Sequence, residues 1–65
     1  MKETLINELI KNEDFADLTE FNEELENDRD EVADYLQWRV DGGHFRNEEI
    51  TPEYKEACKE LLKLI

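Results

Sequence analysis

Residues 18 to 40 read LTEFNEELENDRDEVADYLQWRV, and this stretch decides the fold. Its apolar residues recur at helical spacing, with Leu18, Leu25 and Val32 at one position of a seven-residue repeat. The repeat is interrupted at Asp28, where an aspartate takes an apolar position. Two structures fit this pattern: one long helix, or two helices that meet near the aspartate.

Two capping patterns bear on that choice. Asp17 and Glu20 have the spacing of a capping box, in which two side chains satisfy the free amides of a helix N-terminus. Asp28 and Glu31 repeat the same spacing inside the stretch. A second helix start favours two short helices over one long helix.

The segments on either side are also helical in pattern. Leu5, Ile6, Leu9 and Ile10 form a stripe on one face of a helix near the N-terminus. The middle stretch ends at two consecutive glycines, which suit the left-handed turn that closes a helix. Residues 44 to 50 are expected to form a loop.

The last segment has the clearest start signal in the chain. Thr51 is a good N-cap, and Pro52 suits the first helical position because its missing amide would be unpaired there. Apolar side chains then recur on one face through Tyr54, Cys58 and Leu61 to the end.

The predicted fold class is therefore all-α, a compact bundle of three or four short helices, with residues 1 to 65 as a single domain. Apolar residues of the middle stretch should meet those of the first and last helices in the core. The predicted core consists of Phe15, Leu18, Phe21, Leu25, Val32, Leu36, Val40, Leu5, Leu9, Leu61, Leu62 and Ile65.

A chain of 65 residues has only marginal stability, and Cys58 is its single cysteine, so no disulfide can form within the chain. A homodimer is one way to supply further support, and the sequence leaves monomer and dimer open. A lone thiol, the lack of a signal-peptide pattern and the lack of a long apolar run predict a cytoplasmic protein with no membrane contact.

The charge is concentrated in one segment. Between Asn12 and Asp34 there are eleven acidic residues and one basic residue, Arg29, so this window carries −10 of the net charge of −11. Such a field attracts basic surfaces and repels nucleic acid and anionic membranes. If the window were one straight helix, it would span roughly 35 Å with about one carboxylate per 3 Å, close to the phosphate spacing of a DNA strand.

This density suggests a protein that imitates the DNA backbone and thereby occludes a basic, nucleic-acid-binding surface of a host protein. In composition alone, the chain resembles small acidic inhibitors of phages and mobile elements. Trp38, on the flank of the acidic segment, is either an anchor for the partner or a core residue against the last helix. The predicted partner-binding residues are Asp17, Glu20, Glu23, Glu24, Asp30, Glu31, Asp34 and Trp38.

The alternative function is a structural or regulatory module. Its apolar helix faces would pair with a second copy of the chain or with a partner helix, and its acidity would serve solubility. Charge runs on helices are commonly solvated faces of this kind.

No catalytic residue, metal site or cofactor is predicted, and we expect a protein that is not an enzyme. His44 stands alone in a loop, and Cys58 falls on an apolar helix face, where a buried structural thiol is expected. The acids after Asn27 do not form a calcium loop: counted from Asp28, the sixth and twelfth positions hold Ala33 and Arg39 instead of glycine and glutamate.

Overall fold

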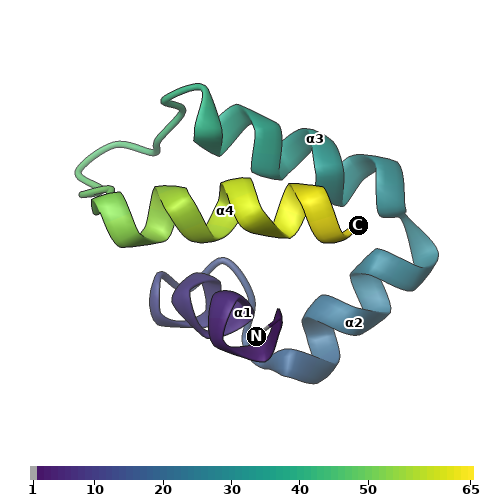
Figure 1. Cartoon of the computed structure of the whole chain (residues 1–65). Helices are drawn as coiled ribbons and strands as arrows, with labels where there is room; N and C mark the ends of the chain where they lie inside the picture. Colours follow the sequence, from purple (N-terminus) through teal and green to yellow (C-terminus); the bar gives the residue numbers. More distant parts are fainter. Residues whose placement is uncertain (1) are drawn as a thin grey trace.

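The computed structural model describes residues 2 to 65 and shows a four-helix, all-α bundle. The helices are α1 (Lys2–Lys11), α2 (Leu18–Asn27), α3 (Arg29–Val40) and α4 (Pro52–Leu64). In Figure 1, α4 lies in the middle, with α3 along one side of it and α1 on the other, and α2 joins α3 at a sharp corner. The predicted fold class is confirmed.

The middle stretch forms two helices, as the repeat of the capping pattern favoured. Asp28 separates them with an irregular backbone conformation. The first capping box forms: the Asp17 carboxylate accepts from the Glu20 amide at 2.8 Å, and the Glu20 carboxylate accepts from the Ala16 amide at 3.3 Å. The capping box predicted from Asp28 and Glu31 was wrong, because the Asp28 side chain makes no capping hydrogen bond to α3.

Two helices end in the same way. After α3, Gly42 takes a left-handed conformation, with φ of 102°, and the Gly43 amide donates to the Trp38 carbonyl at 2.8 Å. After α1, Glu13 takes the left-handed position, with φ of 64°, and the Asp14 amide donates to the Leu9 carbonyl at 3.1 Å. This is the Schellman pattern, which usually has glycine at the left-handed position.

The start of α4 confirms its predicted cap, since the Thr51 hydroxyl accepts from the Tyr54 amide at 3.1 Å and Pro52 opens the helix. All four helices contribute to the core, with α4 packed on α1 and α3, and α2 packed on the same two helices. The core consists of Ile6, Leu9, Phe21, Leu25, Val32, Leu36, Tyr54, Ala57, Cys58 and Leu61.

Six of the twelve predicted core residues are buried, and five more lie at the margin of the core. Phe15, Val40, Leu5, Leu62 and Ile65 are partly buried and pack against the central residues. The prediction for Leu18 was wrong: it is 36% exposed, because it is the first residue of α2, where the helix starts at the surface. No helix within residues 2 to 65 is long and apolar enough to cross a bilayer.

Candidate functional site

The acidic segment forms the outer side of the bundle along the end of α1, the following loop, α2 and the first half of α3. Every carboxylate predicted to bind a partner is exposed to solvent; these are Asp17, Glu20, Glu23, Glu24, Asp30, Glu31 and Asp34. Within the described residues, only one acid of the window, Asp14, forms an ion pair with a basic side chain of the chain itself. The negative charge of this side is therefore largely uncompensated.

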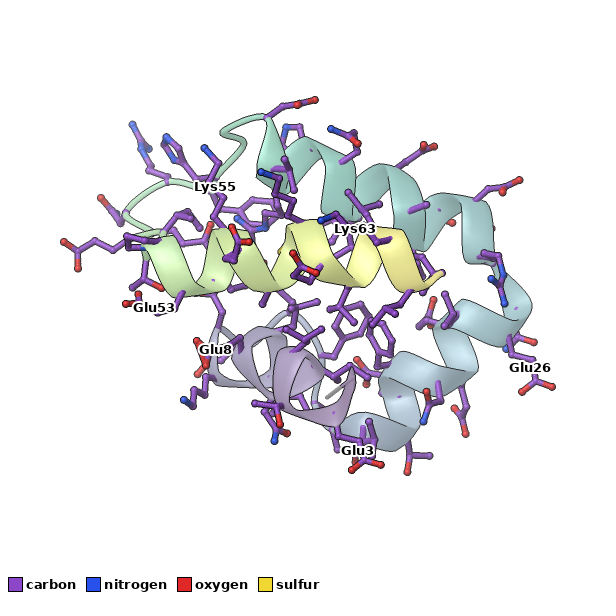
Figure 2. The ribbon with its side chains drawn as sticks, viewed as in Figure 1. Glu3, Glu8, Glu26, Glu53, Lys55 and Lys63 are labelled. Atoms are coloured by element: carbon purple, nitrogen blue, oxygen red, sulfur yellow. The ribbon has the colours of Figure 1, made fainter. Side chains whose placement is uncertain are left out.

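The exposed acids do not form a straight ladder. A continuous helix across the window would be roughly 35 Å long, whereas the longest dimension of the whole chain is 29 Å. The bend at Asp28 turns α3 away from α2 and breaks the expected rows. Other acids point outward on several sides of the molecule, as Glu3, Glu8, Glu26 and Glu53 do in Figure 2.

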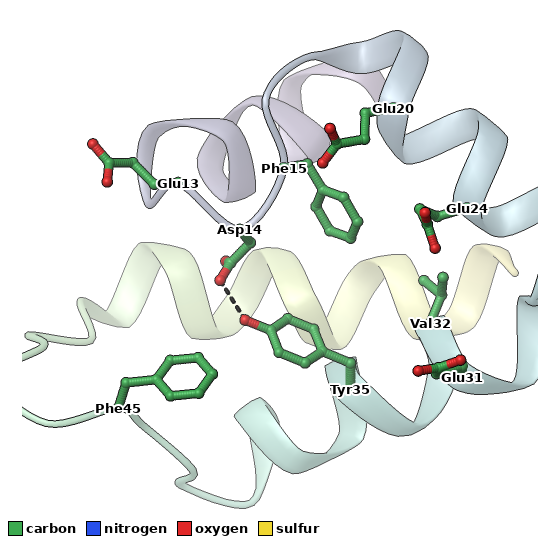
Figure 3. Close-up of a pocket in the computed structure, with 9 residues that line it drawn as sticks. All are labelled: Glu13, Asp14, Phe15, Glu20, Glu24, Glu31, Val32, Tyr35 and Phe45. Carbon is green, nitrogen blue, oxygen red and sulfur yellow. Dashed lines mark hydrogen bonds between the residues drawn. The ribbon is translucent and has the colours of Figure 1, made fainter.

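The bend instead creates a hollow in the surface with a volume of about 430 Å³. Three predicted binding residues line it: Glu20 and Glu24 from α2, and Glu31 from α3. Figure 3 shows these carboxylates at one end of the hollow, with the rings of Phe15 and Tyr35 between the loop and α3. The other lining residues are Glu13, Asp14, Val32 and Phe45.

Helical geometry explains which acids reach the hollow. Glu20 and Glu24 are four residues apart and therefore lie on the same flank of α2, beside the buried face that Phe21 and Leu25 form. The remaining predicted carboxylates do not line the hollow: Asp17 caps α2, and Glu23, Asp30 and Asp34 are exposed outside its lining.

Like charges crowd the end of the hollow at the helix corner. A side-chain hydrogen bond with Asp28 and the negative charge of Asp28, Glu24 and Asp34 raise the pKa of Glu31 above its usual range. Asp28 at the bend, and to a smaller degree Glu24 of α2, thus act on Glu31 of α3, and a cation placed there would relieve this repulsion.

Trp38 lies beside the hollow, next to another exposed aromatic residue. Trp38 is 41% exposed and Phe45 is 57% exposed, and their ring centroids are 5.3 Å apart. This exposure argues against the alternative in which Trp38 is a core residue packed against the last helix. The Trp38 ring lies over Gly43, where an added Cβ would come within 2.2 Å of the indole. The centroid of the same ring is 5.2 Å from the guanidinium carbon of Arg39.

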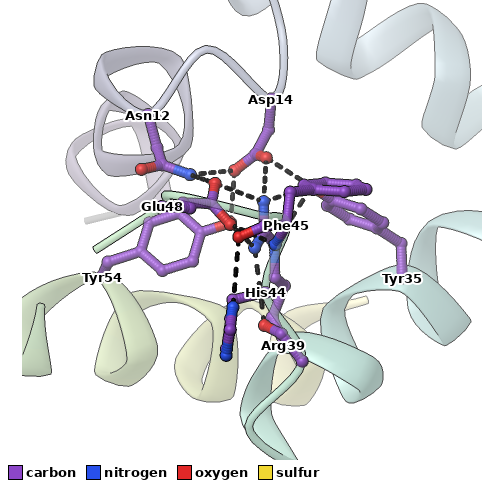
Figure 4. A network of polar contacts seen from close by, with 9 residues as sticks. Asn12, Asp14, Tyr35, Arg39, His44, Phe45, Glu48 and Tyr54 are labelled. Atoms are coloured by element: carbon purple, nitrogen blue, oxygen red, sulfur yellow. Dashed lines mark hydrogen bonds and ion pairs between the residues drawn. The ribbon is translucent and has the colours of Figure 1, made fainter. Parts of the chain in front are cut away.

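A buried arginine supports this part of the molecule from within. Arg39 is fully buried, and it forms ion pairs with Asp14, at 2.7 Å, and with Glu48. The Asp14 side chain is 3% exposed and the Glu48 side chain is 16% exposed. Tyr35 and Tyr54 donate their hydroxyl protons to the two oxygens of Asp14, as Figure 4 shows for this network. No buried side-chain nitrogen or oxygen within the described residues is left without a hydrogen-bond partner.

The aromatic rings of Tyr35, Trp38, Phe45 and Tyr54 surround the same guanidinium, with centroids 5.0 to 5.4 Å from its central carbon. Cation–π contacts of this kind are strongest where water is excluded. Arg39 is therefore held by two carboxylates and four rings.

The network sets the ionisation of its members. A hydrogen bond from Arg39 lowers the pKa of Glu48 to about 2. Burial, followed by the hydrogen bond to Asp14, raises the pKa of Tyr35 to about 12. Burial alone would lower the pKa of Arg39, but hydrogen bonds to Glu48, Asp14 and Tyr35 raise it further above its ordinary value.

This network also positions the hollow. Asp14 ties the loop after α1 to α3, and Glu48 ties the loop between α3 and α4 to the same arginine. The Phe45 amide donates to Glu48 at 3.0 Å, which places the Phe45 ring at the rim. Asp14, Tyr35 and Phe45 thus belong both to the network and to the wall of the hollow.

Arg39 was not among the predicted site residues, although its position in the sequence contains a signal. Leu36 lies four residues after Val32, and Arg39 lies three residues after Leu36. This spacing puts Arg39 on the buried face of α3. An arginine at a core position needs buried acidic partners. Neither the distant Glu48 nor the choice of Asp14 among so many acids could be read from spacing.

The remaining candidates have no assigned chemistry. Cys58 is buried, as expected, and burial raises the pKa of its thiol to about 11, which disfavours the reactive thiolate. His44 is an exposed loop residue, also as expected. In the part of the chain that the structure describes, no three histidine, cysteine or acidic side chains are placed to hold a metal ion.

A scan against protein-family models gives no match, and searches of curated proteins and of solved structures give none either. Any functional inference therefore depends on the residues of this chain.

Proposed function

We propose that this chain is a non-enzymatic acidic binding protein that occludes a basic surface of a host protein, and that this surface binds nucleic acid when the chain is absent. The acidic side of α2 and α3, with the hollow at their corner, would be the contact. The expected location is the cytoplasm, where such partners are abundant.

The observation that carries the proposal is the exposure of the acidic window without internal compensation. Ten of its eleven acids lack an ion pair among the described side chains, since only Asp14 has one. Solubility alone needs a net charge of about 2 to 8 and gains nothing from clustering. The clustering also costs stability through self-repulsion. A basic partner would offset that cost.

The bend changes the form of the mimicry that we propose. Along one straight helix the acids would match the charge density of a DNA strand. The bend at Asp28 places them around a corner instead of along a line. We therefore propose a compact plug for a basic cleft, with Trp38 and Phe45 as apolar anchors beside the charge. Aromatic residues are common in the energetic centres of interfaces, and acidic steering would speed the encounter.

The alternative, pairing through apolar helix faces, has less support. The predicted faces are largely used within the bundle, where Leu9, Tyr54 and Leu61 are buried. Within the described part of the chain, the large apolar side chains that stay exposed are Leu18, Trp38, Phe45 and Leu64. Truncating Leu64 to alanine tests the alternative. A chain that sediments as a dimer, and as a monomer after Leu64→Ala, would favour pairing through apolar helix faces.

Affinity capture tests the proposal. The tagged chain should retain a nucleic-acid-binding protein from host lysate at roughly 0.01 M salt and release it near 1 M, where the screening length falls from about 30 Å to 3 Å. Duplex DNA should compete with the chain for the captured protein. Retention that is insensitive to both salt and DNA would refute the proposal.

The variant Glu20→Lys/Glu24→Lys/Glu31→Lys should abolish capture while the helix content, measured by circular dichroism, stays unchanged. These side chains are exposed and lie outside the buried network. The variant loses the hydrogen bond from the Ala16 amide to Glu20 but keeps the Asp17 cap of α2, which binds the backbone amide of residue 20. Undiminished capture by the triple variant would refute the assignment of the surface.

A further inference from the structure

From the lining of the hollow, we infer that it seats the side chain of an arginine that the partner inserts between Glu20, Glu24 and Glu31. This inference rests on the proposed function and deepens it, because it names the chemical group that the site recognises.

The hollow matches both ends of a long basic side chain. Its wall includes the apolar or aromatic side chains of Phe15, Val32 and Tyr35, which suit an aliphatic stem. Carboxylates of α2 and α3 stand at one end, where a cationic head would lie. Asp28 at the bend, and to a lesser degree Glu24, raise the pKa of Glu31, so negative charge also surrounds this end of the hollow.

Arginine fits better than lysine for two reasons. A guanidinium is planar, donates to two carboxylates at once and stacks on aromatic faces, whereas an ammonium is a strongly hydrated point charge. The chain already holds one arginine in such surroundings: Arg39 has two carboxylate partners and packs on Tyr35 and Phe45. Those two rings also line the hollow.

Two defined peptides test the inference without knowledge of the partner. In one, arginine alternates with alanine; in the other, lysine takes the place of arginine. Binding is measured by isothermal titration at roughly 0.01 M salt, where charge interactions reach about 30 Å. We expect the arginine peptide to bind the wild-type chain at least threefold more tightly, and to shift the amide and ring NMR signals of Phe15 and Tyr35.

A pair of matched variants separates the hollow from the general acidic field. Glu24→Gln/Glu31→Gln removes two charges from the hollow, and Glu23→Gln/Glu26→Gln removes two from positions on α2 that do not line it. Loss of two exposed ion pairs should weaken the arginine peptide about tenfold in the first variant. The second variant should lose less than about threefold, because only the screened long-range field changes.

The outcomes separate this inference from the proposed function. Equal losses in the two variants, or equal affinities for the two peptides, would overturn the arginine seat while the salt-dependent acidic docking surface stood. Absence of binding to either peptide would overturn both. Circular dichroism of each variant establishes that the helices are intact.

Discussion

Replacing Arg39 with methionine should bring the bundle to the edge of unfolding. The change leaves the Asp14 and Glu48 side chains, 3% and 16% exposed, without their cation. Removing one partner of a buried ion pair typically costs about 3–5 kcal/mol. A domain of 65 residues has a total unfolding free energy of about 3–10 kcal/mol at the usual stability per residue. The loss is therefore comparable to the whole stability.

Urea denaturation followed by circular dichroism measures this loss, since urea, unlike guanidinium, does not screen the charges. Arg29→Met is the matched control. Arg29 is exposed and makes one hydrogen bond, to the Ile65 carbonyl at 2.8 Å, so its loss should cost less than about 1 kcal/mol.

A compensated variant isolates the cause. Adding Asp14→Asn and Glu48→Gln to Arg39→Met removes the two uncompensated charges together, and buried ion groups removed as a set cost far less than one partner alone. We expect the triple variant to recover at least half of the lost stability. If Arg39→Met were no worse than Arg29→Met, or if the triple variant were no better than Arg39→Met, the reasoning would be refuted.

Three further predictions concern the backbone and the network. Glu13→Gly should raise the unfolding free energy by about 0.5–1 kcal/mol, because a left-handed residue with a side chain is strained. Asn47 is also left-handed, with φ of 64°, but asparagine tolerates that conformation, so Asn47→Gly should raise the unfolding free energy less. Because the pKa of Glu48 is lowered, its contribution to stability is present above about pH 4.5 and is lost as the pH falls towards about 2. The midpoint of urea denaturation should fall over this pH range, and it should fall less in Glu48→Gln. The pKa of Tyr35 is raised to about 12, and that of Tyr54 is also raised. The contribution of the two tyrosines to stability is therefore present below pH 10 and is lost as the pH rises through their raised pKa values. Phenolate absorbance that appears near pH 10 in the folded chain would contradict this.

Much of the fold was predictable because local patterns and burial agree. The stripe of α1, the cap of α4 and the glycine turn after α3 each depend on neighbouring residues, and each was confirmed. The bend at Asp28 was also indicated by sequence, through the aspartate that interrupts the apolar repeat.

The site was less predictable because it depends on distant contacts. Exposure of the acids followed from helical periodicity, but their gathering around a hollow depends on the angle between α2 and α3. α2 packs on α1 and α3. The loop before α2 is held by Arg39, whose partners Asp14 and Glu48 lie 25 and 9 residues away along the chain. Spacing on a single helix contains no information about such contacts.

In the proposed function, the acidic side of α2 and α3 takes the place of nucleic acid on a basic protein surface. The most direct measurement is the fluorescence anisotropy of a labelled duplex bound to the captured partner while this chain is titrated in. We expect the anisotropy to fall to that of free DNA, and the variant Glu20→Lys/Glu24→Lys/Glu31→Lys to have no such effect. An anisotropy that stays high while the chain binds, because all three components form one complex, would contradict the proposed function.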